Sequence, residues 1–92
     1  PANITQLIFE SNFNQKIDKL PSSIRELTIC SKFQHEIPNF ITNITIINNN
    51  NSKCNIALPF SLKILKTNLS KYLLPKIPFG CIIYDLKGNV IN

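Results

Sequence analysis

The stretch LPSSIRELTICSKFQHEI, residues 20–37, contains a pattern that recurs along the whole chain. A proline is followed by apolar residues three, six and eight positions later, here Pro21 with Ile24, Leu27 and Ile29. Proline fixes its own φ and disfavours helix in the residue before it, so the pattern begins in a turn. A short strand is expected directly after that turn.

Side chains of residues 26–30 alternate between outward and inward positions, which is typical of a half-buried β-strand. The chain is expected to turn again near Lys32. Phe33 and Ile37 then return to the interior on the opposite side. The stretch therefore predicts one coil, made of a turn, a strand and an irregular return segment.

The pattern occurs five times, starting at prolines that are 20, 17, 21 and 19 residues apart: Pro1, Pro21, Pro38, Pro59 and Pro78. The residues at its three apolar positions, Thr67 being the one polar member, are Ile4/Leu7/Phe9, Ile24/Leu27/Ile29, Ile41/Ile44/Ile46, Leu62/Leu65/Thr67 and Cys81/Tyr84/Leu86. A period near 20 residues with one strand per period is typical of a solenoid, in which each unit is stabilised by stacking on its neighbours.

The sequence therefore predicts a mainly β solenoid in a single domain, with about five short coils. A parallel strand ladder forms one face and irregular segments return on the other. The coils span roughly residues 1–20, 21–37, 38–58, 59–77 and 78–92, and are called the first to fifth coils below.

Neither end of the chain contains a polar terminal coil, and the sequence starts at Pro1 with no methionine anywhere. Uncapped solenoid ends expose apolar core. The chain is therefore expected to be a fragment of a longer protein, with further coils or another domain beyond it, and self-association through uncapped ends is a possible alternative.

Two segments resemble a known family: LPSSI at residues 20–24 and FNQKI at residues 13–17 are similar to the FNIP repeat. This short relative of the leucine-rich repeat is known from social amoebae and from giant DNA viruses of amoebae. The third to fifth coils keep the strand pattern and lose the Phe-Asn closing motif. The resemblance implies a leucine-rich-repeat-like fold. FNIP arrays often follow an F-box, which implies the substrate-recognition arm of an F-box type ubiquitin ligase adaptor, although these residues contain no F-box.

Outward side chains of stacked strands form a continuous ribbon, which is where solenoids bind partners. The candidate partner-binding residues are Gln6, Ile8, Glu10, Glu26, Thr28, Asn43, Thr45, Ile47, Ile64, Lys66, Ile83 and Asp85. Four of them are isoleucines, at positions where the side chain is expected to be exposed to water. They either contact a partner or are tolerated for their strand propensity. A protein partner of unknown identity is expected.

Catalytic chemistry has no support in the sequence. His35 is the one histidine and has no cysteine or serine at motif spacing, and the five acidic residues lie in different coils without pairing. Gly80 and Gly88 stand alone, so no glycine-rich phosphate loop is present. We expect no enzyme activity, no cofactor and no metal.

Composition bears on the remaining classes of partner. The net charge of +5 includes a cluster of four lysines between Lys63 and Lys76, yet no aromatic-rich basic stripe accompanies it, so nucleic acid is not the expected partner. No run of 18 apolar residues exists, and membrane insertion is not expected. Three cysteines at unrelated spacings indicate reduced thiols and a cytoplasmic location, in the host cytoplasm if the protein is viral.

These observations favour a non-catalytic protein-protein interaction module. The alternative from another class is a structural or self-assembling component of a particle.

Overall fold

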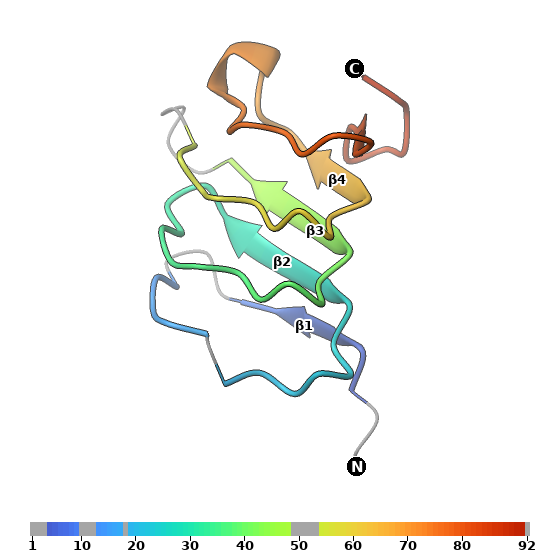
Figure 1. Ribbon diagram of the computed structural model, residues 1–92. Coiled ribbons are helices and arrows are strands. Elements are labelled where there is room, and N and C mark those ends of the chain that lie inside the picture. The colour runs from blue at the N-terminus through green and yellow to red at the C-terminus, as the bar shows by residue number, and fades with distance from the viewer. Residues whose placement is uncertain (1–3, 10–12, 18, 49–53, 92) are drawn as a thin grey trace.

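The computed structural model describes residues 4–9, 13–17, 19–48 and 54–91 (Figure 1). Its five strands form one sheet in chain order and are β1 (Gln6–Ile8), β2 (Glu26–Cys30), β3 (Asn43–Ile47), β4 (Ile64–Thr67) and β5 (Ile82–Tyr84). Every neighbouring pair of these strands is parallel. The predicted solenoid is thereby confirmed, with about four turns.

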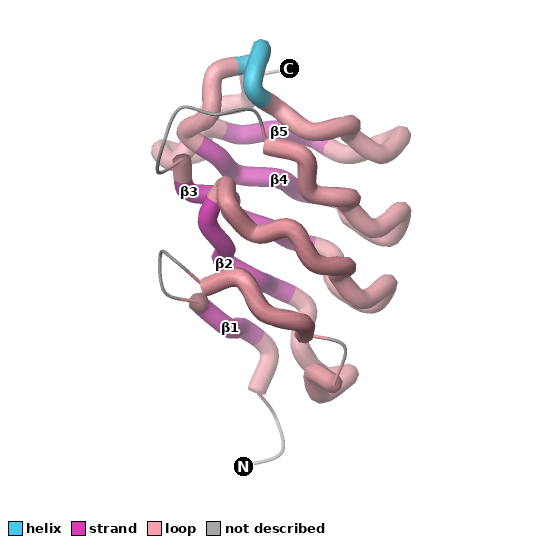
Figure 2. Tube along the Cα trace, turned by 90° about the vertical axis from the view of Figure 1, so that its left-hand side faces the viewer, coloured by secondary structure: helices cyan, strands magenta, loops and turns pink. Residues whose placement is uncertain are grey.

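The coils stack along the long axis of the molecule, with the strands on one side and the return segments on the other (Figure 2). A single turn of 3-10 helix, η1 (Lys71–Leu73), interrupts the return segment of the fourth coil. The molecule measures 37 × 26 × 22 Å. The narrow cross-section leaves room for one thin core, which runs the length of the stack.

The core consists of inward side chains that lie directly above one another. One row is set by the strand register, which pairs Leu7 with Leu27, Leu27 with Ile44, Ile44 with Leu65 and Leu65 with Ile83. All but Leu7 are buried; Leu7 lies in the first coil and is half-buried. Because each coil covers the next, removal of one apolar side chain affects the packing of its neighbours as well.

Serine side chains join the turns of successive coils. The Ser23 hydroxyl donates to the carbonyl of Ile4 at 2.7 Å, and the Ser61 hydroxyl donates to the carbonyl of Ile41 at 2.8 Å. Both serines lie two residues after the proline that starts their coil. A serine at this position therefore makes the same hydrogen bond to the preceding coil in both cases.

A recurrent irregularity precedes each inner strand. The N–H groups of Arg25 and Glu26 both donate to the carbonyl of Thr5, at 2.9 and 3.2 Å. The carbonyls of Arg25 and Thr42 each accept two successive N–H groups of the following coil in the same way. One extra residue is thus accommodated before each of β2, β3 and β4, as in a β-bulge.

The fifth coil lacks this extra residue. Five positions separate Pro59 from the start of β4 at Ile64, whereas four separate Pro78 from the start of β5 at Ile82. Among the described residues, the N–H of Ile82 alone donates to the carbonyl at the equivalent position, that of Lys63, at 3.0 Å. Because strand side chains alternate, the one-residue change reverses which side chains face inward.

The predicted apolar triplet of the fifth coil is therefore wrong after its first member. Cys81 is buried as expected, but Ile83 takes the inward position and is 5% exposed. Tyr84 points to the outer face and Leu86 is exposed in the turn that follows. The physical reason is that the extra residue between the turn and the strand is missing before β5.

Thr67 is the polar residue in an otherwise apolar row, and it is fully buried. Its hydroxyl donates to the carbonyl of Ile46 at 2.8 Å and accepts from the N–H of Leu69 at 3.1 Å. Both capacities of the hydroxyl are used, so its burial leaves no hydrogen bond unmade.

Three phenylalanine rings stack between the first two coils. The ring centroids of Phe9 and Phe13 are 4.2 Å apart, and Phe33 lies 6.5 Å from Phe9 and 6.2 Å from Phe13, with all three rings close to parallel. Phe33 is completely buried. The stack occupies the part of the chain where the Phe-Asn closing motif was recognised.

The free edge of β5 is covered by the segment that follows it. Tyr84 pairs with Val90 in an antiparallel bridge, and the N–H of Ile91 donates to the carbonyl of Ile83 at 2.9 Å. The Asp85 carboxylate holds the intervening turn, since it accepts from the backbone N–H groups of Lys87 and Asn89, both at 2.9 Å. This antiparallel segment therefore covers part of the outer edge of β5.

Candidate functional site: the outer face of the sheet

The outer face of the strand ladder carries two rows of side chains fixed by the register. The first row consists of Gln6, Glu26, Asn43, Ile64 and Ile82, and the second of Ile8, Thr28, Thr45, Lys66 and Tyr84. Neighbouring strands lie about 4.8 Å apart. Ten side chains distant in sequence therefore form one continuous surface.

A shallow hollow of about 90 Å³ lies in the middle of this surface. Its lining consists of seven ribbon residues and two residues of the core row: Gln6, Glu26, Leu27, Thr28, Asn43, Ile44, Thr45, Ile64 and Lys66. The hollow exists because the side chains of the central coils, Thr28, Asn43 and Thr45, are short. Such a surface suits an extended segment laid across the strands better than a small ligand, whose pockets are several times larger.

The ribbon carries charges of opposite sign in its second and fourth coils. Glu26 is exposed in the second coil, and Lys66 is exposed in the fourth. Two strand spacings, about 10 Å, separate their strands. Within the described ranges neither side chain has an ion-pair partner on the protein. Both charges are available to a bound partner.

The amide of Asn43, between these charges, is oriented by its neighbour. The Thr42 hydroxyl donates to Asn43 Oδ1 at 3.0 Å. This contact uses the acceptor of the amide and leaves its Nδ2 donor for a ligand. Asn43 therefore offers a hydrogen bond at the centre of the hollow.

Most predicted ribbon residues lie where the sequence places them. Gln6, Ile8, Glu26, Thr28, Asn43, Thr45, Ile64 and Lys66 occupy the two outer rows, and Ile47 follows at the end of β3. Ile8 is 66% exposed, whereas Ile47 and Ile64 are half-buried. Glu10 lies outside the described residues.

Two predicted members do not belong to the ribbon. Ile83 faces the core, and Asp85 lies in the turn after β5, where its carboxylate binds backbone N–H groups. Ile82 and Tyr84 take their places, because the fifth coil is one residue shorter before its strand. Gly80, in the turn after Pro78, adopts a φ of 82°, which glycine accommodates without strain.

Cys30, expected to face outward, is also buried, and its thiol lies 3.9 Å from the carbonyl of Phe13. Cys54 and Cys81 are buried as well, and all three cysteines are free. Burial raises the pKa of the Cys54 thiol and of the Cys81 thiol. These two side chains are therefore protonated and poorly nucleophilic at neutral pH.

No group of three His, Cys, Asp or Glu side chains within the described ranges is placed to hold a metal ion. The His35 ring packs edge-on against Phe33, with centroids 5.8 Å apart, and its Nε2 lies 3.2 Å from the carbonyl of Asn14. No helix within the described ranges is long and apolar enough to cross a membrane.

Comparison with known proteins bears on the first part of the chain. No curated protein and no solved structure matches the chain. The model of one family, the FNIP repeat, matches residues 1–32. This range holds β1, the turn at Pro21, β2 and the FNQKI segment that carried the resemblance. Residues 1–32 therefore contain an FNIP repeat, as their sequence predicted.

Proposed function

We propose that this protein is a non-catalytic protein-binding module whose partner lies across the outer face of the sheet. The observation that carries the proposal is the two-row register, which aligns side chains of all five strands into one surface with a central hollow. Solenoids present extended surfaces of this kind to partners. The FNIP repeat in residues 1–32 supports a role in protein interaction.

The side chains of the ribbon define what the partner needs. Glu26 favours a cation over the second coil, Lys66 favours a carboxylate over the fourth, and the Asn43 Nδ2 favours an acceptor between them. Ile8, at 66% exposure, and Ile82, at 43%, provide apolar contacts at the two ends. The partner is thus an extended segment with a positive charge toward β1 and a negative charge toward β5.

The family resemblance supports a more specific role, the substrate-recognition arm of an F-box type ubiquitin ligase adaptor in the cytoplasm. In that role the bound protein is a substrate for ubiquitin conjugation. Its ubiquitin conjugates should fall when the ribbon is altered in the full-length protein.

The experiment compares two double variants that both keep the net charge. Glu26→Lys/Lys66→Glu reverses the two charges of the ribbon. Lys16→Glu/Glu36→Lys makes the same exchange on the return segments, where both residues are exposed. Each is immobilised and used to capture proteins from cell extract beside the unaltered chain.

We expect a specific protein to be retained by the unaltered chain and by the return-segment variant, and lost from the ribbon variant. Reversal of charges at a complementary interface costs several kcal/mol, so the loss should be complete at micromolar concentrations. Equal retention by both variants would show that the partner does not use this face.

A further inference from the structure

Besides the ribbon, two phenylalanines project from the turns of the last two coils. Phe60 is 80% exposed, and Phe79 is fully exposed, at 104%. Each directly follows the proline that starts its coil, Pro59 or Pro78. Stacking of the coils therefore brings the two rings to one side of the molecule.

The equivalent position is polar in the second and third coils. Ser22 follows Pro21 and Asn39 follows Pro38. The turn itself is the same in all four coils, because the N–H of the residue three after each proline donates to that proline's carbonyl, at 3.0–3.3 Å. The fold thus accepts a small polar residue here. Phenylalanine at this position in two successive coils is not required by the turn.

The two phenylalanines border a hollow of about 360 Å³. Its remaining lining comes from the return segments of the third and fourth coils: Ile56, Ala57, Leu58, Lys76, Ile77 and Pro78. Ile56 is buried, whereas Leu58 and Ile77 are half-buried. The volume lies within the range of about 300–1,000 Å³ for sites that hold ligand groups. We call this surface the Phe60/Phe79 patch.

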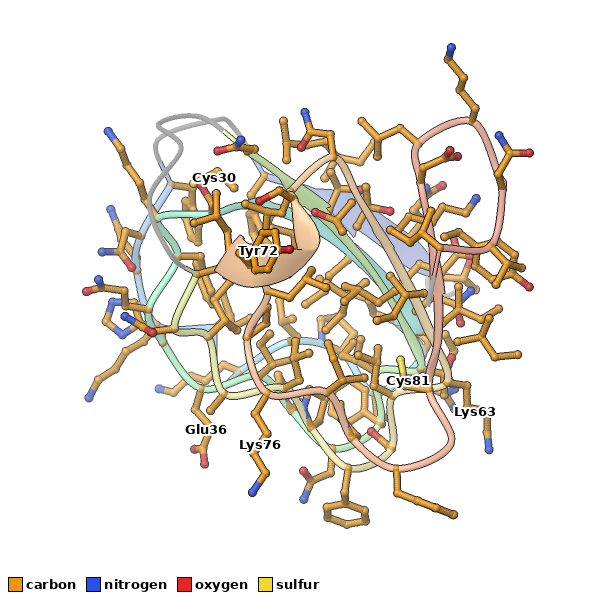
Figure 3. The ribbon with its side chains drawn as sticks, turned by 90° about the horizontal axis from the view of Figure 1, so that it is seen from above. Cys30, Glu36, Lys63, Tyr72, Lys76 and Cys81 are labelled. Carbon is orange, nitrogen blue, oxygen red and sulfur yellow. The ribbon has the colours of Figure 1, made fainter. Side chains whose placement is uncertain are left out.

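Lys76 is the charged residue among the described residues that line the patch. Viewed along the solenoid, Lys76 extends at the lower left of the molecule and Lys63 at the lower right (Figure 3). Glu36 extends beside Lys76 in this view, but it belongs to the second coil and borders a different hollow, with Lys16 and His35.

The excess of positive charge is concentrated in the same coils. Residues 59–92 hold five lysines and one aspartate, a net charge of +4, whereas residues 1–58 hold five basic and four acidic residues, a net charge of +1. Backbone hydrogen bonds from Asn89 first of all hold the pKa of Asp85 below its ordinary value. Of these five lysines, Lys76 lines the patch, so a partner there meets an apolar surface with a positive charge at its border.

We propose that the Phe60/Phe79 patch is a second docking site, which binds a short segment of a partner protein with apolar side chains flanked by Asp or Glu. Apolar side chains of the segment enter the hollow between the rings, and a carboxylate of the segment lies near Lys76. A hollow with half-buried walls fits inserted side chains, which favours a peptide over a flat lipid surface. This site lies apart from the ribbon and does not depend on its function.

The test uses a phage-displayed library of random 12-residue peptides, selected on the 92-residue chain. The comparison variant is Phe60→Ser/Phe79→Asn, which carries the residues that the second and third coils already have at this position. Both side chains are exposed, so the variant should fold, and its circular dichroism checks this. Lys76→Glu, which leaves both rings intact, is the second variant.

We expect enriched peptides that combine apolar and acidic residues. A synthetic, fluorescently labelled copy should bind the unaltered chain at least about tenfold more tightly than either variant, because exposed aromatic anchors dominate such interfaces. The ribbon variant Glu26→Lys/Lys66→Glu should bind this peptide normally. That control separates failure of the patch from failure of the ribbon.

Three outcomes would overturn the proposal. The first is a selection in which no peptide distinguishes the unaltered chain from Phe60→Ser/Phe79→Asn. The second is binding of the chain to vesicles of phosphatidylserine and phosphatidylcholine that depends on the two phenylalanines, since the patch would then contact a lipid surface. The third is dimerisation in sedimentation experiments that the same variant abolishes, since a second copy would then be the occupant.

Discussion

Replacing Phe33 by alanine tests the claim that the stacked aromatic rings hold the first two coils together. Phe33 is completely buried and contacts Phe9, Phe13 and His35 through its ring. Truncation of a buried phenylalanine to alanine costs about 3–5 kcal/mol of unfolding free energy. The total for 92 residues is about 5–14 kcal/mol, at 0.05–0.15 kcal/mol per residue. Phe33→Ala should therefore remove about a fifth of the stability or more.

Thermal unfolding followed by circular dichroism measures this effect, with Phe60→Ala as the matched control. Each kcal/mol lowers the melting temperature of a domain of this size by about 4–8 °C, so Phe33→Ala should lower it by at least about 12 °C. Phe60 is 80% exposed, and its truncation should shift the melting temperature by no more than about 4 °C, since exposed sites change stability by about 0.5 kcal/mol or less. Similar shifts for the two variants would refute the placement of Phe33 in the core.

Three further predictions concern the core threonine, the C-terminal turn and the thiols. Thr67→Val leaves the carbonyl of Ile46 and the N–H of Leu69 without their hydroxyl partner, so urea unfolding should show a loss of about 1–3 kcal/mol; an equally stable variant would contradict the two hydrogen bonds. Because the pKa of Asp85 is lowered in the folded protein, its contribution is present above the ordinary aspartate pKa and is lost as the pH falls through the lowered value. Protection of the Ile91 N–H, its exchange rate relative to that of the unfolded chain at the same pH, should fall during that acid titration, and Asp85→Asn should abolish the dependence; an unchanged pH profile in the variant would exclude Asp85 as its source. Buried thiols should react with a thiol reagent at least about tenfold more slowly in the native chain than in denaturant, as an opening free energy of about 1.4 kcal/mol requires, and native rates equal to unfolded rates would contradict their burial.

Much of the fold could be predicted from the proline-led repeat, because a solenoid uses the same spacing in every coil. The positions of Leu27, Ile44 and Leu65 in one inward row follow directly from that spacing. The burial of Thr67 also follows from it, although composition alone would have placed a hydroxyl outside. Composition does not reveal that the hydroxyl has a buried hydrogen-bond acceptor, the carbonyl of Ile46, because that carbonyl belongs to another coil.

The fifth coil shows where this reasoning fails. A fixed spacing from Pro78 predicts Ile83 outside and Tyr84 inside, but one residue is missing between the turn and β5, and both positions exchange faces. Strand geometry allows no intermediate between the two faces. The outward-facing positions therefore follow the predicted spacing from β1 to β4 and depart from it at β5.

The Phe60/Phe79 patch was not predicted at all from the sequence, although both residues occupy an obvious repeat position. Inward and outward side chains alternate along a strand, so the sequence of a strand predicts which residues are buried. Turns have no such alternation. Comparison of the residue after each proline, Ser22 and Asn39 against the two phenylalanines, would have revealed the change. The interpretation of this change as a docking site depends on the hollow beside the two phenylalanines, which the sequence does not show.

The segment that pairs with β5 also limits how copies of this chain could associate. A filament needs a head-to-tail contact, in which one end of each copy adds a strand to the opposite end of the next. Residues 89–91 already occupy the outer edge of β5 in antiparallel orientation. Another strand could pair with this edge of β5 only after the Tyr84–Val90 bridge and the hydrogen bond from the Ile91 N–H had been released.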